Sequence, residues 1–539
     1  MFIRNDRQEY RTERKQNKKS LRRYNSKMST AARVAKNTGY LYAKMGITMF
    51  ISLYTTRLIL NSLGTSDFGI FNIVGGAIAM LGFLNAAMAG ATQRFMSYTE
   101  GEGDKEKQKK IFNISIILHA GISVIVGVVL LCAGYIFFNG VLNIPADRIF
   151  AAQVVYGSLI VSTMFTVMSV PYDAMLNAHE NMRYYAIVGI IESLLKLSVA
   201  FVVVYTTSDK LIMYGILMAA IPLVTLSIMR IYCHRKYAEC VLSPRRYFDR
   251  SLMKEMTGFA GWNFFRSSLS IIGYQGQSIV LNHFWGSILN AAYGIVSQIQ
   301  GQLLVLSNNL LKAIRPLIVK SEGENNREKM LNISIIGSKL SFLLLLLPGI
   351  PFIVEAPTIF TWWLKKVPDW TITFFYLSMI KTFSEQIFST LSTSIEACGN
   401  IKAISLWCSG LQMFSLLFSI TLFYLNYPPY WLYISYIVFC SIGTGIVYLY
   451  YCGKLCNLSI KRFIVDVICR SITLFLLVFI ISYSCKYIIA DSATQFLLVV
   501  AISFMANMIL GYMILLNKHE QTFIKNALLR NLPSLFKIK

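Results

Sequence analysis

Long apolar stretches alternate with short polar connectors along almost the whole chain of 539 residues. A helix that crosses a bilayer needs about 20 mostly apolar residues, and fourteen stretches satisfy this requirement. The predicted spans are residues 38–60, 67–93, 111–138, 150–171, 184–206, 211–232, 257–284, 288–312, 332–354, 370–397, 402–426, 429–451, 464–486 and 495–516. No connector is long enough to form an independent soluble domain. The pattern predicts an all-α polytopic membrane protein with about 14 transmembrane helices.

Two segments in different halves of the chain resemble each other. Residues 60–115 and 281–334 both begin with Leu-Asn, pass a Gly-Ile, cross an apolar segment to an arginine, and run through Glu-Gly-Glu to Asn-Ile-Ser. Equivalent positions are between about 219 and about 225 residues apart. This spread of matches indicates an internal duplication. Six predicted spans separate the copies, and this even number makes the two halves parallel, related by an axis along the membrane normal.

The duplication divides the chain into four predicted parts. They are a basic cytoplasmic tail (1–37), an N-lobe of six spans (38–235), a C-lobe of six spans that begins with a basic connector (236–455), and two further spans with a basic cytoplasmic tail (456–539). The first 37 residues hold 12 Lys and Arg and no apolar core, so we predict a disordered tail rather than a signal peptide. A second natural start occurs at Met28, and N-terminal sequencing would distinguish it from Met1.

Composition and charge agree with a membrane protein. Of the residues, 55% are hydrophobic and 14% are charged, whereas soluble domains carry about 25% charged residues. The formal net charge is +25, but the basic residues lie in connectors between apolar stretches, which argues against nucleic acid as a partner. With the N-terminus inside, 39 Lys and Arg fall at the cytoplasmic ends. Five lie outside, namely Arg148, Lys210, Lys365, Lys366 and Lys486. This asymmetry predicts that both termini are cytoplasmic.

The sequence offers little support for enzymatic or cofactor chemistry. Ten cysteines are scattered without a paired framework, and five histidines are dispersed without a metal-binding or nucleophile motif. The Walker A pattern is absent. We therefore expect no catalytic residue, no metal and no cofactor, and the choice of a coupling ion, H⁺ or Na⁺, stays open.

Ionisable residues within spans are the candidates for function, because each costs about 2.5–3.5 kcal/mol to insert and seldom faces lipid. Several can pair along one helix at i,i+4: Glu192 with Lys196, Lys381 with Glu385, and Asp466 with Arg470. We regard the first two pairs as secondary candidates for the site, with a structural pair as the alternative. Lys339 and Arg470 lie close enough to the cytoplasmic end to extend to the interface.

Three cations in spans have no local acid: Lys44 and Arg57 on the first helix, and Arg266 on the seventh. The repeat places Lys44 and Arg266 at nearly the same depth in the two lobes. An interfacial position is the alternative for Lys44 and for Arg57, which lies about 20 Å further along the axis. Arg266 is well inside its span and is the first choice. Unpaired cations between two lobes suit an anionic substrate, and arginine matches phosphate oxygens.

Several motifs resemble those of a known family. They are AKNT (35–38), SLYTTRLILNSLGTSDFGIFNIVGG (52–76), ATQRF (91–95), VPYDAMLNAHENM (170–182), FAGWNFF (259–265), LNAAYGIVSQ (289–298) and WLKKVP (363–368). Together they resemble the Wzx-type polysaccharide and oligosaccharide flippases of the MOP superfamily, in the form common in Bacteroides-like bacteria. The similarity runs from about residue 29 to about residue 400.

The resemblance implies a MATE-like fold and a role in the bacterial cytoplasmic (inner) membrane. The implied activity moves an undecaprenyl-pyrophosphate-linked oligosaccharide, a repeat unit of O-antigen, capsule or exopolysaccharide, to the outer leaflet by alternating access. Other polysaccharide-assembly proteins are implied as partners. Such transporters have a cationic central cavity that receives the pyrophosphate, and the resemblance implies that Lys44, Arg57 and Arg266 line the corresponding cavity here. This chain departs from the family at Arg266, where a small residue is expected, and at Tyr293, where an arginine is expected.

Two other functions are weighed against this one. A MATE-like multidrug antiporter for organic cations would need unpaired acids in its cavity, whereas the unpaired residues here are basic. An O-antigen polymerase or ligase would need a large outer loop with charged residues, and the longest outer connector, at about 355–369, is short. The sequence therefore favours a flippase over an enzyme.

Overall fold

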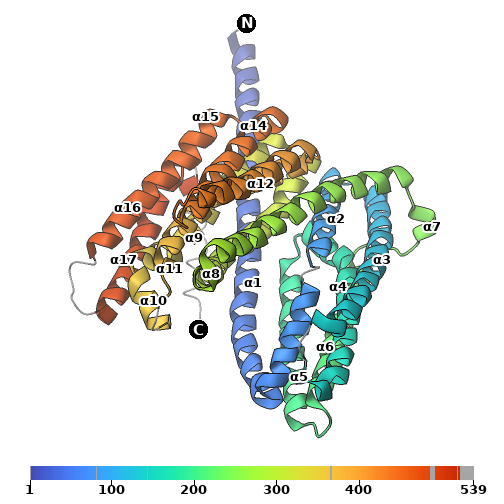
Figure 1. Ribbon diagram of the computed structural model, residues 1–539. Helices are drawn as coiled ribbons and strands as arrows, with labels where there is room; N and C mark the ends of the chain where they lie inside the picture. Colours follow the sequence, from blue (N-terminus) through green and yellow to red (C-terminus); the bar gives the residue numbers. More distant parts are fainter. Residues whose placement is uncertain are drawn as a thin grey trace, which may run out of the picture.

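A computed structural model describes residues 2–79, 82–141, 144–364, 367–485, 492–518 and 520–521. Within these ranges the chain forms helices and no strand, as predicted (Figure 1). The N-lobe contains α1 (Phe2–Ala79), α2 (Gly82–Glu102), α3 (Lys105–Ile136), η1 (Phe137–Val141), η2 (Ala146–Arg148), α4 (Ile149–Ala178), α5 (Met182–Tyr205) and α6 (Lys210–Lys236).

The C-lobe begins after a connector that contains the short helix α7 (Pro244–Tyr247). It contains α8 (Arg250–Gly323), α9 (Arg327–Val354), α10 (Ala356–Leu364), α11 (Thr371–Ala397), α12 (Lys402–Tyr424), α13 (Trp431–Tyr436), η3 (Ile437–Gly443) and α14 (Thr444–Cys456). The two predicted C-terminal spans follow as α15 (Ile460–Phe463), η4 (Ile464–Cys469), α16 (Arg470–Cys485), α17 (Ser492–Leu510) and η5 (Gly511–Leu515).

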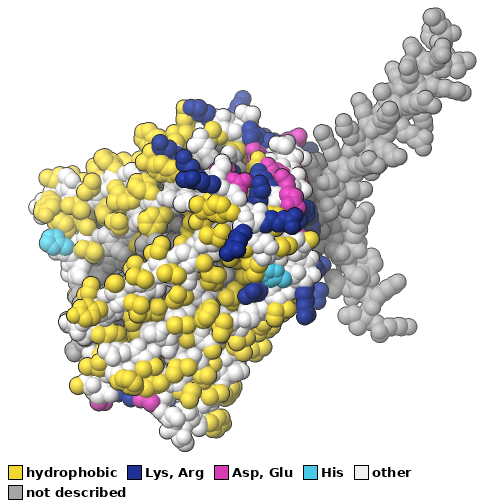
Figure 2. Space-filling view, turned by 90° about the vertical axis from the view of Figure 1, so that its right-hand side faces the viewer, with side chains coloured by type: hydrophobic (Ala, Val, Ile, Leu, Met, Phe, Trp, Pro, Cys, Tyr) yellow, Lys and Arg dark blue, Asp and Glu magenta, His cyan; other side chains and the backbone are white. Residues whose placement is uncertain are grey.

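The two lobes lie beside each other, and their basic connectors share one end of the bundle (Figure 1). We call this the basic end; it carries residues 94–110, 179–181, 236–254 and 315–329. Lys, Arg, Asp and Glu side chains gather there, while hydrophobic side chains cover most of the rest of the face in Figure 2. An apolar surface of this kind suits a lipid environment.

Nine helices among the described residues are long and apolar enough to cross a membrane. The other five predicted spans lie in α1, α2, α8 and α11, which are less apolar. Two of these helices, α1 and α8, line the space between the lobes, where polar side chains are tolerated. The fold class is confirmed, and the number of fourteen spans stays a prediction.

Two glycines mark the sharp turns that the sequence predicts as short outer loops. Gly64 within α1 has φ +75° and Gly286 within α8 has φ +77°. Glycine adopts this left-handed backbone without the penalty of a Cβ. The two residues are 222 positions apart, as the internal duplication requires.

The N-terminal tail is a correction to the sequence prediction. Residues 2–37, predicted to be disordered, continue the first span as helix in α1. The segment contains neither proline nor glycine before Gly39, and it is rich in Arg, Lys, Gln and Glu, which favour helix. Helix propensity therefore outweighs the lack of apolar residues in this segment.

The end opposite the basic end is tied together by Arg148. Its guanidinium pairs with Asp67 near the turn in α1 and, at 2.7 Å, with Asp209 at the start of α6. This predicted outer arginine therefore joins two hairpins of the N-lobe. The predicted outer residues Lys365, Lys366 and Lys486 lie outside the described residues.

Candidate functional site

A cavity of about 670 Å³ lies between the two lobes. Its walls come from α1, α5 and α6 of the N-lobe and from residues 302–306 of α8 in the C-lobe. The lining combines hydroxyl and amide groups with methionine and aliphatic side chains; the polar members are Thr48, Ser52, Thr55, Thr56, Ser193, Tyr214, Gln302 and Lys196. Such a surface can offer hydrogen bonds to a polar ligand and apolar contact to a hydrophobic one.

Two lysines from opposite lobes meet beside this cavity. Lys44 of α1 lies with its Nζ 4.4 Å from the ring centroid of Tyr185, and Lys312 of α8 lies with its Nζ 3.8 Å from the same centroid. Lys312 also donates a hydrogen bond to the Tyr185 hydroxyl. Lys312 follows Leu306 of the cavity wall by six residues, which is about 9 Å along the helix. The two ammonium groups thus lie just beyond the cavity, toward the basic end.

The positive charge of this lysine pair is only partly compensated. Asp173 of α4 is the carboxylate that interacts electrostatically with both Lys44 and Lys312. Two ammonium groups against one carboxylate leave a net positive charge. The arrangement can therefore attract an anion that touches both lobes at once.

The sequence of α5 allows Lys44 to reach this position. A Cβ at Gly189 would overlap Cε and Nζ of Lys44, so the lysine chain lies directly across the glycine. Any larger residue at 189 would displace the ammonium group. Glycine at this position therefore positions the site as well as packing the helices.

The other two primary candidates lie elsewhere. Arg57 is exposed, does not line the cavity, and forms no ion pair with a described residue.

Arg266 is a correction, because the sequence predicts an unpaired cation and the structure supplies an acid. Arg266 Nη2 lies 2.7 Å from Oε1 of Glu396 on α11, which also accepts a hydrogen bond from Ser392. The packing of α11 against α8 brings these partners together, whereas the spacing of charges along a single helix does not reveal them.

The secondary candidates form the predicted pairs. Lys196 Nζ lies 2.7 Å from Glu192 Oε1, and Lys381 Nζ lies 3.8 Å from Glu385 Oε1. Lys196 is the charged residue among those lining the cavity, whereas the Lys381 pair lies on α11 in the C-lobe.

Two further predictions concern charged residues in the later spans, Asp466 with Arg470 and Lys339. Asp466 and Arg470 are 3.3 Å apart, so this i,i+4 pair is also as predicted. The expectation that Lys339 extends to the interface is wrong. Lys339 is buried and pairs with Glu520 at 3.1 Å.

Three residues of the lysine cluster escape sequence reasoning. Lys312 is the last residue of a predicted span and looks like a connector residue. Asp173 lies within the motif at residues 170–182, and Tyr185 follows that motif by three residues. A cation at the end of one predicted span and a carboxylate two residues beyond the end of another are the signals that the sequence offers. Their juxtaposition depends on how the lobes pack.

The basic end is closed by a reciprocal crossing of the two repeats. A Cβ at Gly101 would overlap the carbonyl oxygen of Lys320, and a Cβ at Gly323 would overlap the carbonyl oxygen of Tyr98. Each residue is related to its counterpart by 222 positions. The backbones of α2 and α8 can approach this closely only because both Glu-Gly-Glu segments contain glycine.

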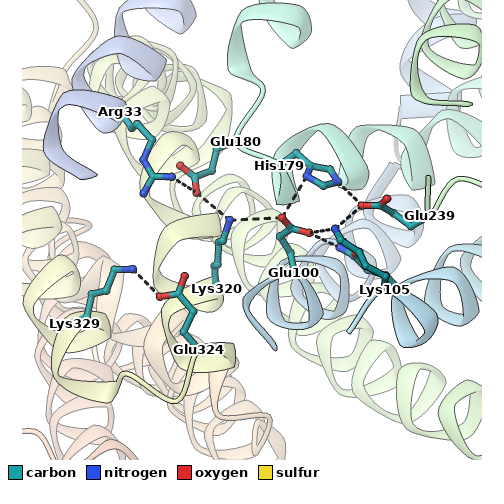
Figure 3. Close-up of polar contacts among 10 residues, drawn as sticks. Arg33, Glu100, Lys105, His179, Glu180, Glu239, Lys320, Glu324 and Lys329 are labelled. Atoms are coloured by element: carbon teal, nitrogen blue, oxygen red, sulfur yellow. Dashed lines mark hydrogen bonds and ion pairs between the residues drawn. The ribbon is translucent and has the colours of Figure 1, made fainter. Parts of the chain in front are cut away.

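Ion pairs repeat around this crossing. Lys107 lies 2.8 Å from Glu102 in one repeat. Lys329 lies 2.7 Å from Glu324 in the other repeat (Figure 3). Arg94 adds a bond across the lobes, since it donates to the carbonyl oxygens of Glu396 and Ala397 at 2.7 and 3.1 Å.

One group at the basic end has the residue types of a metal site. Ligand atoms of Glu100, His179 and Glu239 lie within 4.8 Å of one another. Lys105 Nζ lies 3.1 Å from Glu100 and 2.9 Å from Glu239. An ammonium group therefore already pairs with both carboxylates, and the group is better described as an ion-pair network.

Comparison with known proteins agrees with this architecture. Residues 34–321 match the model of a family described as polysaccharide biosynthesis protein. A curated relative, the uncharacterized membrane protein EpsK of Bacillus subtilis (strain 168), is 21% identical over 309 residues, which are 56% of this chain and 60% of the relative.

Solved structures share the fold at low sequence identity. A multidrug resistance MATE family transporter of the MOP superfamily in an outward-facing conformation has a TM-score of 0.63 at 15% identity, covering 79% of this chain and 96% of its own. A MATE in a bent conformation has a TM-score of 0.65 at 15% identity, covering 80% and 96%.

A third structure is a MOP superfamily transporter from Pyrococcus furiosus whose binding pocket is described as reversed in polarity. It has a TM-score of 0.60 at 14% identity, covering 80% of this chain and 96% of its own. Since the family model matches more than half of the chain, this chain belongs to the polysaccharide biosynthesis protein family, and it shares the fold of the MATE transporters.

Proposed function

We propose that this protein moves an undecaprenyl-pyrophosphate-linked oligosaccharide across the bacterial cytoplasmic membrane by alternating access. The observation that carries the proposal is the pair of Lys44 and Lys312, which come from opposite lobes and share one carboxylate. A diphosphate presents several anionic oxygens and could contact both ammonium groups together. Binding would then couple the substrate to the relative position of the lobes.

The cavity supports the remaining parts of such a substrate. Its hydroxyl and amide groups suit sugars, and its methionine and aliphatic side chains suit a lipid chain. In this proposal the basic end faces the cytoplasm, as the distribution of Lys and Arg predicts. The structure is then closed to the cytoplasm, and the cavity belongs to the outward-facing state.

A MATE-like antiporter for organic cations is the second candidate, because the fold is shared. Its ligand would need a cavity with excess negative charge. Here Glu192 is neutralised by Lys196, and Asp173 faces two lysines. The charges therefore favour an anionic substrate.

Lys44→Ala and Lys312→Ala test the proposal. Each change removes one charge-assisted contact of about 1.5–3 kcal/mol, so surface-polysaccharide export should fall by roughly tenfold to a hundredfold. Export is measured in a strain that lacks its own flippase, with the amount of protein in the membrane measured alongside.

Lys381→Ala is the matched control, because Lys381 is also partly buried and paired but lies on α11 away from the cavity. It should retain export. Wild-type export by both the Lys44 and Lys312 variants would remove this site from the proposal.

A further inference from the structure

His179 lies between two carboxylates at the basic end, immediately after α4. Its Nδ1 lies 3.4 Å from Glu100 Oε1, and its Nε2 lies 2.9 Å from Glu239 Oε1 (Figure 3). Its ring stacks on Tyr237 at 4.1 Å between centroids. A neutral imidazole can donate at only one nitrogen, whereas an imidazolium can donate to both carboxylates. The geometry therefore favours the protonated ring.

The charges around His179 come from several elements. Lys105 of α3 contacts both Glu100 and Glu239. Burial disfavours the charged imidazolium, but the hydrogen bonds to Glu100 and Glu239 outweigh it and raise the pKa of His179 above its ordinary value. The same network holds the pKa of Glu239 at about 2, despite its burial, so the carboxylate stays ionised.

Lys320 brings the charge of the other lobe into this network. Its Nζ lies 3.7 Å from Glu100 Oε1 and 3.7 Å from Glu180 Oε1. Glu180 also contacts Arg33 at 3.5 Å, and its second oxygen is buried without a hydrogen-bond partner among the described residues. Lys320 is therefore the cation that ties α8 of the C-lobe to two acids of the N-lobe.

His179 and Lys320 compete for one atom. Both face Oε1 of Glu100, so each positive charge lies within 3.7 Å of that oxygen. Because both nitrogens face the same oxygen, at 3.4 and 3.7 Å, the two like charges are no more than about 7 Å apart. They repel, and each weakens the hold of the other on the shared carboxylate. His179, Glu100 and Glu239 all belong to the N-lobe side, so they stay together when the lobes part, whereas Lys320 leaves with α8.

We infer that His179 is a proton-binding site linked to the opening of the basic end, with protonation favouring the open state. Lys320 is present only in the closed state, so the proton is held more tightly after opening. By reciprocity, binding the proton favours opening. The inference rests on the alternating access of the proposed function, but not on which substrate is carried.

The sign and range of the effect follow from this linkage. The pKa of His179 is higher in the open state than in the closed state, and the closed-state pKa is itself above the ordinary value of about 6.5. The open-to-closed ratio should therefore rise as the pH falls through these two values. From the separation of the charges, the rise should be roughly 3- to 30-fold.

Distances between spin labels at positions 106 and 328 measure the opening. Glu106 and Glu328 are exposed, equivalent in the two repeats and on opposite lobes. Labels attached through a non-canonical amino acid spare the ten native cysteines. Protein in nanodiscs without substrate is measured by double electron–electron resonance from about pH 9 to about pH 6, around the histidine range. Because no substrate is present, the result is independent of the identity of the substrate.

The wild type should show more of the long distance as the pH falls, and His179→Gln should not. His234→Gln is the matched control and should keep the response. His234 lies in the last turn of α6, two residues before the basic end, and faces Tyr172 rather than a carboxylate. A wild type without pH response, or a His179→Gln variant that keeps it, overturns the inference.

Lys320→Gln tests the inference independently if His179→Gln fails to fold. This variant keeps His179 and removes its competitor, so it should open more at every pH and lose the pH dependence. A Lys320→Gln variant with the wild-type response overturns the inference as well.

Discussion

Gly101→Ala should open the basic end without damaging the fold. In the closed structure the new methyl group would overlap the carbonyl oxygen of Lys320. The three nearest atoms all belong to the backbone of Lys320 and Glu324, so no side-chain movement can relieve the overlap. Gly101 lies within α2 and does not have a positive φ, so alanine suits its own helix. The gain in helix propensity, about 1 kcal/mol, applies to the open and the closed state alike.

The size of the shift follows from the cost of the overlap. Forcing an extra methyl group into a packed contact costs about 1–3 kcal/mol, and only the closed state bears this cost. Since 1.36 kcal/mol corresponds to tenfold, the open-to-closed ratio should rise by between about fivefold and about 150-fold. Gly323→Ala should act in the same way, because Gly323 faces the carbonyl oxygen of Tyr98. The two changes together should add less than twice the effect, since one opening relieves both overlaps.

The labelled pair at positions 106 and 328 reports this ratio directly at a fixed pH of about 8, above the ordinary histidine value. Gly90→Ala is the matched control. It lies on the same helix and gains the same propensity, but its new methyl group would meet only Asn263 at 3.9 Å, an ordinary contact. If Gly101→Ala and Gly90→Ala give the same distance distribution, the glycine crossing does not control closure.

Two further predictions concern the candidate arginines. Arg266→Ala leaves Glu396 partly buried without its cation, so the free energy of unfolding should fall by about 1–3 kcal/mol. This loss is smaller than for a fully buried pair, because about a quarter of each side chain is exposed. Thermal unfolding in detergent measures this loss. A double change of Arg266 and Glu396 to methionine should regain both stability and export. A double variant that regains stability but not export would indicate that Arg266 contacts the substrate. Arg57→Ala should leave stability within about 0.5 kcal/mol, because the side chain is exposed, and should lower export more than Arg57→Lys if charge alone matters. Equal losses of export would instead indicate contact through the guanidinium fork.

The sequence by itself determines the class of the protein and its symmetry. Apolar length predicts the spans, and the duplicated Glu-Gly-Glu segments predict two parallel lobes, because these signals lie within short stretches of chain. The i,i+4 pairs such as Glu192 with Lys196 are equally local, since helix geometry alone brings the partners together. The helical tail is a local feature as well, because the absence of proline and glycine before Gly39 favours helix although the segment has few apolar residues.

Only the tertiary structure decides which charges stand alone. Arg266 looks unpaired along its own helix, yet Glu396 lies 130 positions away in sequence and 2.7 Å away in space. Lys312 looks like a connector residue, yet it meets Lys44 from the other lobe over the ring of Tyr185. Electrostatic interactions depend on distance in space, and the packing of one lobe on the other sets that distance for residues far apart in sequence. The fold was therefore readable from local patterns, and the site was not.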